Sequence, residues 1–275
     1  ERPSLDAALK AARWLDAAAI KTPQGLTWPA DPRDAGSINN TLYAGTPGVI
    51  LFYLEAFAST KNQEFLGRAR AGARELAAHL AEEKGTGLYE GIAGIGFALE
   101  ETFKATAERQ FRDGFLSSLK ILQEKAHKAG RGVEWSAVTD IISGSAGTGL
   151  FLLYAYRELK QKVWLDLAEK AGLRLIELGK PKNGGLEWAM DPEFPRLMPN
   201  FSHGTAGIAY FLAALYEETR KKGFLEAAVA GAKDLQSIAK TEGDICLIFH
   251  HEPEGKDLYY LGWCHGPVGT ANLFY

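Results

Sequence analysis

The chain has 275 residues, 46% of them hydrophobic, and a formal net charge of −3. This size and hydrophobicity allow a large core in one domain, or two at most, while the small net charge excludes an electrostatic footprint for nucleic acid or an anionic membrane. No apolar run approaches the ~20 residues that span a bilayer, and the N-terminus lacks a signal-peptide core, so we expect a cytoplasmic protein without a membrane span.

Five segments carry apolar residues at helical spacing, with charged residues on the opposite face. This pattern predicts amphipathic helices that contact water on one side and a core on the other. In chain order they are Ser4–Ile20, Glu64–Ala81, Phe111–His127, Val163–Leu178 and Phe224–Ala239.

A second kind of helix follows a short glycine motif that occurs five times. Each copy is a glycine, two residues and another glycine, and the first glycines are Gly45, Gly91, Gly144, Gly204 and Gly266. Their spacing of 46 to 62 residues suits a repeated pair of helices with loops of variable length. The helices that follow are apolar nearly all round, which predicts a buried inner layer.

Alternating amphipathic outer helices and apolar inner helices predict an all-α protein, an α/α toroid, as a single domain over residues 1–275. Glycine suits each inner-helix entry, where the chain turns sharply and a Cβ would collide with its surroundings. The long connections precede the inner helices at residues 21–42, 130–142, 181–202 and 241–262. In the last of these, the runs 244–251 and 258–262 predict a short β-hairpin.

The fourth and fifth glycine motifs differ from the rest because His203 and His265 precede their first glycines. Other copies have Ala44, Glu90 or Ser143 there. The scaffold therefore does not require histidine, and both histidines are candidate catalytic residues at the mouth of an inner helix.

The two cysteines, Cys246 and Cys264, do not suggest a disulfide scaffold in a chain of this length. Cys264 adjoins His265 and suits a metal ligand, a nucleophile or a buried thiol. One alternative is a local metal site in which Cys246 and His250 or His251 join Cys264.

The segment Gly262-Trp-Cys-His-Gly-Pro-Val-Gly269, together with Phe201-Ser-His-Gly-Thr-Ala-Gly-Ile208 and the recurring glycine pairs, resembles the lanthionine synthetase C-like family. The resemblance implies a toroid that holds one zinc ion, with Cys264 as one ligand. It also implies that His203 is the acid/base residue and Asp140 its carboxylate partner. The family's remaining zinc ligands belong to the next repeat, so we expect a chain truncated inside the fifth inner helix, with those ligands beyond its end.

The resemblance implies a zinc-dependent enzyme that adds a cysteine thiol to dehydroalanine or dehydrobutyrine, closing a thioether in a modified peptide such as a lantibiotic. The expected partners are the dehydrated peptide or a thiol, and a dehydratase. Zinc lowers the pKa of a bound thiol, and a positioned histidine protonates the resulting enolate. The Trp-Cys-His form is similar to eukaryotic-type members, which add glutathione.

Two alternatives from other classes stay open. A non-catalytic toroid could bind peptide or protein, since the missing zinc ligands and the tryptophans of the long loops suit such a role. A carbohydrate-active toroid could use paired carboxylates, with Asp140 and either Glu187 or Asp191 as candidates.

Overall fold

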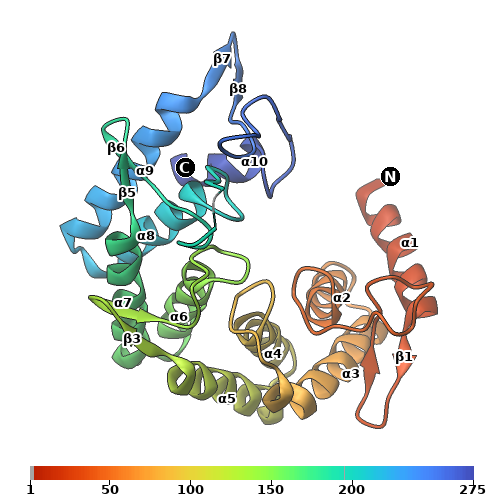
Figure 1. The fold of residues 1–275 in the computed structure, drawn as a ribbon. Coiled ribbons are helices and arrows are strands. Elements are labelled where there is room, and N and C mark those ends of the chain that lie inside the picture. The colour runs from red at the N-terminus through yellow and green to blue at the C-terminus, as the bar shows by residue number, and fades with distance from the viewer. Residues whose placement is uncertain (1–2, 195) are drawn as a thin grey trace. The chain divides into compact units, whose positions relative to one another are not determined.

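The structure, a computed structural model, describes residues 3–194 and 196–275. Helices dominate the described residues (Figure 1). The α-helices are α1 (Pro3–Ala18), α2 (Thr46–Thr60), α3 (Gln63–His79), α4 (Ile92–Thr106), α5 (Arg109–Lys125), α6 (Ser145–Leu159), α7 (Lys162–Leu178), α8 (Thr205–Thr219), α9 (Lys222–Ile238) and α10 (Pro267–Thr270). Two short 3₁₀ helices, η1 (Leu80–Glu82) and η2 (Ala271–Phe274), follow α3 and α10. Across this described part, no helix is long and apolar enough to cross a membrane.

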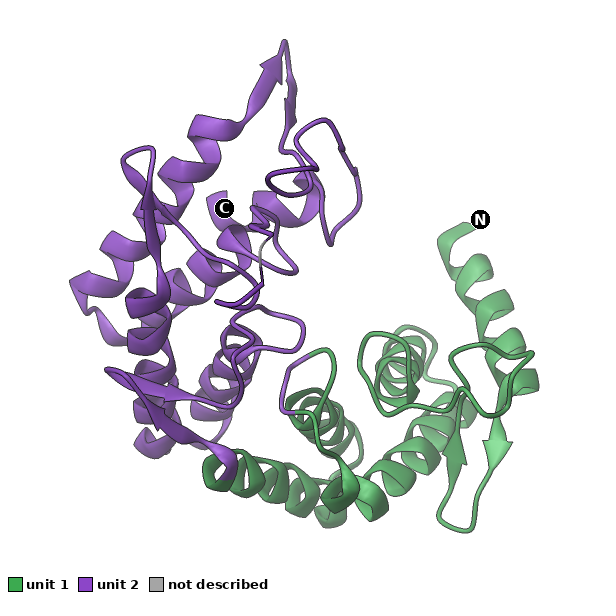
Figure 2. Cartoon of the chain, viewed as in Figure 1, with its two compact units in different colours: residues 1–85, 89–124 green, residues 86–88, 125–275 purple. Residues whose placement is uncertain are grey.

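The chain forms two compact units (Figure 2). The first comprises residues 1–85 and 89–124, and the second comprises residues 86–88 and 125–275. All residues proposed from the sequence for chemistry lie in the second unit. The single domain over residues 1–275 stays a prediction.

Each unit consists of packed helix pairs. In the first unit α2 packs on α3, and α4 lies against both. In the second, α6 packs on α7, α8 packs on α9, and α6 also contacts α8. The five predicted amphipathic helices are confirmed as α1, α3, α5, α7 and α9, with ends within two residues of those expected. Their apolar faces supply much of the core, as with Phe111, Phe115 and Leu119 of α5, which are fully buried.

The inner helices α2, α4, α6, α8 and α10 each begin directly after the first glycine of a motif. At the starts of α2, α6, α8 and α10, the second glycine lies in the first turn, against the carbonyl group of a residue six positions earlier. A Cβ at Gly147 would collide with the carbonyl oxygen of Ile141, and one at Gly207 with that of Phe201. The glycines therefore allow the loop to pass close over the start of the helix.

Four inner helices end in the same way, on a left-handed residue that the sequence pattern did not indicate. These cap residues are Lys61, Ala107, Lys160 and Arg220, with φ between 54° and 60°. Each donates its backbone N–H to the carbonyl four residues earlier, and the next outer helix begins two residues later. The tight reversal keeps each pair of helices in contact although none of these residues is glycine.

Four antiparallel hairpins follow outer helices. They pair β1 (Ile20–Lys21) with β2 (Leu26–Thr27), β3 (His127–Ala129) with β4 (Gly132–Glu134), β5 (Lys180–Lys182) with β6 (Gly185–Glu187), and β7 (Lys240–Glu242) with β8 (Ile245–Leu247). The predicted hairpin of residues 244–251 with 258–262 is wrong, because β8 pairs with the preceding strand β7. The turn between these two strands contains Gly243, which has a positive φ of 58°. Residues 248–258 instead form a loop.

Two tryptophans fasten hairpins to helices. Trp28 and Trp188 are at most 1% exposed. Their indole N–H groups donate to carbonyl groups of the preceding outer helices, on Leu15 and Leu175. Their backbone N–H groups donate to threonines at the start of α2 and α8. These side chains therefore cap the core.

Candidate functional site

Asp140 is a buried carboxylate at the entry to α6. It is 1% exposed, and its Oδ1 accepts hydrogen bonds from the backbone N–H groups of Ser143 (2.8 Å) and Gly144 (2.9 Å). Its Oδ2 lies 2.7 Å from Nδ1 of His203. The backbone bonds fix the direction of the carboxylate, so its second oxygen is held against the imidazole.

His203 lies directly before the N-cap glycine of α8. Its backbone N–H donates to Oδ1 of Asn200 at 3.3 Å, and its side chain is 26% exposed. The contact with Asp140 assigns the hydrogen to Nδ1 and leaves Nε2 as the ring nitrogen without a hydrogen-bond partner among the described residues. An imidazole oriented by a buried carboxylate and still reachable from solvent can take up and deliver a proton.

Cys264 is partly exposed and is tied to the residue before His203. Ser202 donates both its backbone N–H (3.1 Å) and its hydroxyl (2.8 Å) to the carbonyl oxygen of Cys264. Next to them, the rings of Phe201 and Trp263 meet edge to face with centroids 5.3 Å apart. The fourth and fifth glycine motifs are thus joined at the residues that the sequence singled out.

His265 stacks on His203, with ring centroids 5.4 Å apart and planes inclined by 28°. Burial, reinforced by the neighbouring His250 and His203, lowers the pKa of His265 to about 4. Its Nδ1 is buried and has no hydrogen-bond partner in the described part of the chain. His265 is therefore a neutral imidazole at neutral pH. The structure brings together the predicted residues Asp140, His203, Cys264 and His265.

Two more residues belong to this cluster: His250, which the sequence suggested only as an alternative metal ligand with Cys264, and Tyr260, to which the sequence assigned no role. The ring of His250 lies 4.3 Å from that of His265, between centroids, and Tyr260 lies 5.0 Å from His250 and 5.9 Å from His265. His250 lies in the loop of residues 248–258, and Tyr260 lies just after it. Their approach depends on how residues 248–258 fold back, for which the sequence has no periodic signal.

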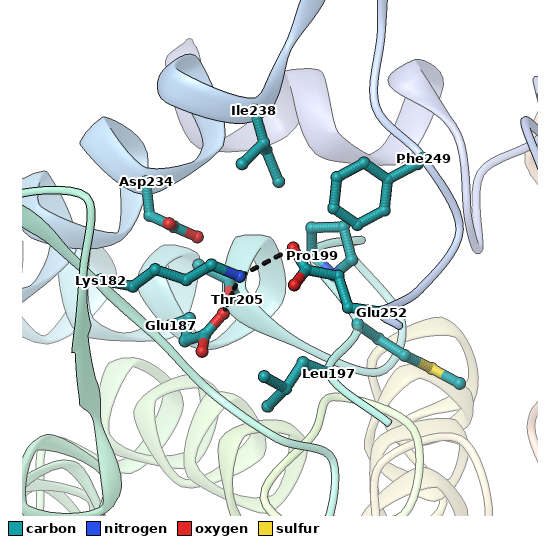
Figure 3. A pocket seen from close by; sticks show the side chains of 10 residues that line it. Lys182, Glu187, Leu197, Pro199, Thr205, Asp234, Ile238, Phe249 and Glu252 are labelled. Carbon is teal, nitrogen blue, oxygen red and sulfur yellow. Dashed lines mark hydrogen bonds and ion pairs between the residues drawn. The ribbon is translucent and has the colours of Figure 1, made fainter. Parts of the chain in front are cut away.

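A small cavity close to this loop holds a second group of charges (Figure 3). The Lys182 ammonium lies 2.6 Å from Glu187 and 2.8 Å from Glu252. Asp234 is 1% exposed, and its Oδ1 has no hydrogen-bond partner among the described residues. Burial raises the pKa of Asp234 to about 6, and the nearby carboxylates add to that effect.

The three carboxylates considered for a carbohydrate-active toroid each contact a different residue. Asp140 is bonded to His203, Glu187 is paired with Lys182, and Asp191 accepts a backbone N–H from Glu193 on an exposed loop. Each carboxylate therefore has its own local partner.

Within residues 3–194 and 196–275, no three His, Cys, Asp or Glu side chains are grouped so that they could hold a metal ion. Cys264 alone does not make a site, and Cys246 is exposed on β8. The described residues by themselves therefore do not fit a zinc centre.

A family model for lanthionine synthetase C-like protein matches residues 36–275. The chain belongs to the lanthionine synthetase C-like family. A search of curated proteins found no match.

Solved structures show that the fold of this lanthionine synthetase C-like chain is shared with enzymes of different activities. Nisin cyclase matches with a TM-score of 0.66 and 18% identity, over 100% of this chain and 70% of that chain. Cellobiose 2-epimerase from Bacillus thermoamylovorans B4167 matches with a TM-score of 0.62 and 14% identity, over 89% and 72%. The α-1,6-mannanase GH76A of Salegentibacter sp. HEL1_6 matches with a TM-score of 0.57 and 15% identity, over 86% and 71%. The predicted all-α, α/α toroid class is confirmed.

Proposed function

We propose that the chain catalyses the addition of a cysteine thiol to dehydroalanine or dehydrobutyrine in a modified peptide, forming a thioether. The contact that supports this proposal is the 2.7 Å pairing of His203 Nδ1 with the buried Asp140. Family membership supports a peptide substrate.

Atoms and electrons balance in this reaction without an oxidant or reductant. The S–H bond of the thiol breaks, sulfur bonds to Cβ of the alkene, and the π electrons move through Cα to the carbonyl oxygen as an enolate. A proton then bonds to Cα and completes the product. We assign this proton to Nε2 of His203, with Asp140 balancing the positive charge of the imidazolium that delivers it.

The proposal extends to zinc, with Cys264 as one ligand and the others outside the described residues. The proton transfer assigned to His203 uses only residues that the structure describes. We propose two partners: the dehydrated peptide, and a dehydratase that makes the alkene in it. The proposed location is the cytoplasm.

The test is thioether formation on a dehydroalanine peptide, measured by mass spectrometry with the natural full-length protein. His203→Asn is expected to slow the reaction roughly 10²–10⁴-fold, because the proton donor is lost. The matched control is His127→Asn, a change at an exposed histidine paired with Glu134 on another hairpin. Equal rates for wild type and His203→Asn would overturn the assignment.

A further inference from the structure

His250 belongs to the candidate site although neither glycine motif contains it. Its ring packs on His265, which in turn stacks on His203, so three imidazoles follow one another at the entry to α8. Tyr260 covers another side of His250, edge to face. His250 is partly exposed, as a group that meets a substrate must be.

Its neighbours assign the hydrogen of this imidazole. Nδ1 of His250 lies 2.7 Å from Nδ1 of His251, so one of the two nitrogens donates and the other accepts. Nε2 of His251 faces the carboxylate of Glu254 at 3.9 Å, which favours a hydrogen on that nitrogen. With its hydrogen on Nε2, His251 accepts at Nδ1, and His250 donates from Nδ1. Nε2 of His250 is left with a lone pair.

The electrostatic surroundings keep His250 neutral. Burial lowers its pKa, and positive charge on His251, His203 or Arg196 would lower it further. No carboxylate is bonded to its ring within the described residues, in contrast to His203 and Asp140. The cluster thus contains one imidazole paired with a buried carboxylate and a second imidazole that is neutral and, among those residues, has no carboxylate bonded to its ring.

The backbone on both sides of His250 is held in place. Its N–H donates to the carbonyl of Leu258 at 2.8 Å, and its carbonyl accepts from Nδ2 of Asn200 at 3.0 Å. Asn200 also accepts the backbone N–H of His203, so one side chain sets the positions of both histidines.

Two residues further on, Glu252 anchors the loop. It exchanges two backbone hydrogen bonds with Leu197, and its carboxylate pairs with Lys182 (Figure 3). Lys182 also pairs with Glu187, which fastens the loop to the hairpin of β5 and β6. A loop held at so many points can present a catalytic group in a fixed direction.

We propose that His250 is a second catalytic residue, whose Nε2 accepts the proton of the attacking thiol while His203 protonates Cα. This assignment rests on the proposed thiol addition. In each cycle the S–H proton bonds to His250 and the His203 proton bonds to Cα. Water then removes the proton from His250 and returns one to His203, which leaves both groups as they began.

The experiment varies how easily the nucleophile ionises. The natural full-length protein adds small thiols of decreasing pKa to a dehydroalanine peptide, and rates are compared for wild type, His250→Asn and the exposed control His127→Asn. With an alkyl thiol, His250→Asn is expected to be roughly 10²-fold slower. With an aryl thiol that is already ionised at the assay pH, the variant is expected to recover most of the wild-type rate, since no proton needs to be accepted.

A spectroscopic readout tests the same assignment in the wild-type chain without metal or substrate. Nitrogen-15 NMR of labelled histidines is expected to show Nε2 of His250 as an unprotonated nitrogen bonded to neither hydrogen nor metal. A protonated Nε2 at neutral pH, or an equal loss for alkyl and aryl thiols in His250→Asn, would overturn the role of His250 and leave the proposed function standing. Absence of thioether with wild type and every thiol would instead contradict the proposed function and this assignment together.

Discussion

The hydroxyl of Ser202 donates to the carbonyl oxygen of Cys264 at 2.8 Å, and Ser202 is completely buried. This bond joins two residues 62 positions apart. It connects the segment that carries His203 with the segment that carries Cys264 and His265. The candidate site is therefore assembled by contacts between neighbouring repeats.

Replacement of Ser202 by alanine removes this hydroxyl bond. We expect the free energy of unfolding to fall by about 1 kcal/mol, the usual net value of a buried hydrogen bond. Urea unfolding measures it. Ser117→Ala is the matched control, since the Ser117 hydroxyl also donates to a carbonyl but on an exposed face of α5. Equal stability losses in the two variants would contradict a special coupling at Ser202.

Replacement of Asp140 by asparagine tests whether the carboxylate acts through His203. The amide keeps the shape but loses the charge, so thioether formation is expected to slow by at least roughly 10²-fold. Because the two side chains act as a unit, the double variant Asp140→Asn with His203→Asn is expected to be no slower than His203→Asn alone. Rate losses that multiply would show that the two residues act independently.

Asp234 predicts a pH dependence of stability. Its folded-state pKa of about 6 lies above the ordinary value of 3.8, so the folded chain holds this proton to higher pH than the unfolded chain. The resulting stability is present below about pH 4 and is lost as pH rises through 6.

Asparagine at position 234 cannot ionise and should remove this effect. We expect Asp234→Asn to be more stable than wild type at pH 8, by at most about 3 kcal/mol, and to match it near pH 4. Urea unfolding of both proteins across this range measures the difference. A constant difference at all pH values would contradict a buried, protonated Asp234.

The outer helices and the five helix entries could be predicted from the sequence because both depend on local patterns. Amphipathic periodicity places the outer helices, and a Cβ is excluded by chain geometry at Gly147 or Gly207. The left-handed caps could not be found, since Ala107 and Lys160 have no intrinsic preference for that conformation. Packing of each helix pair imposes it.

The residues of the candidate site also differ in whether a local sequence pattern could reveal them. His203 and Cys264 stood out because they interrupt a repeat, while the pairing of Asp140 with His203 came only from the family resemblance. The sequence suggested His250 only as an alternative metal ligand, and its contact with His265 could not be predicted, because that contact depends on how Asn200 and Leu258 hold the loop. The predicted pairing of residues 244–251 with 258–262 was wrong for a related reason. Gly243 allows β8 to turn back and pair with β7, which is closer in sequence than residues 258–262.

Metal content tests the proposed role of Cys264. We expect about one zinc per chain in the longest natural form of the protein, lost on Cys264→Ala. Elemental mass spectrometry measures it, and Cys246→Ala, at the exposed cysteine of β8, should keep the metal. Zinc retained in Cys264→Ala would show that the metal is held elsewhere.

The central claim is that His203 delivers the proton to Cα, and the stereochemistry of the product tests it most directly. A proton from a fixed imidazole reaches one face of the enolate, whereas water reaches both. The measurement is the ratio of the two Cα epimers of the thioether, by chiral chromatography, for wild type and His203→Asn. We predict a single epimer from wild type and a mixture in the residual product of His203→Asn. The same single epimer from both proteins would contradict the claim.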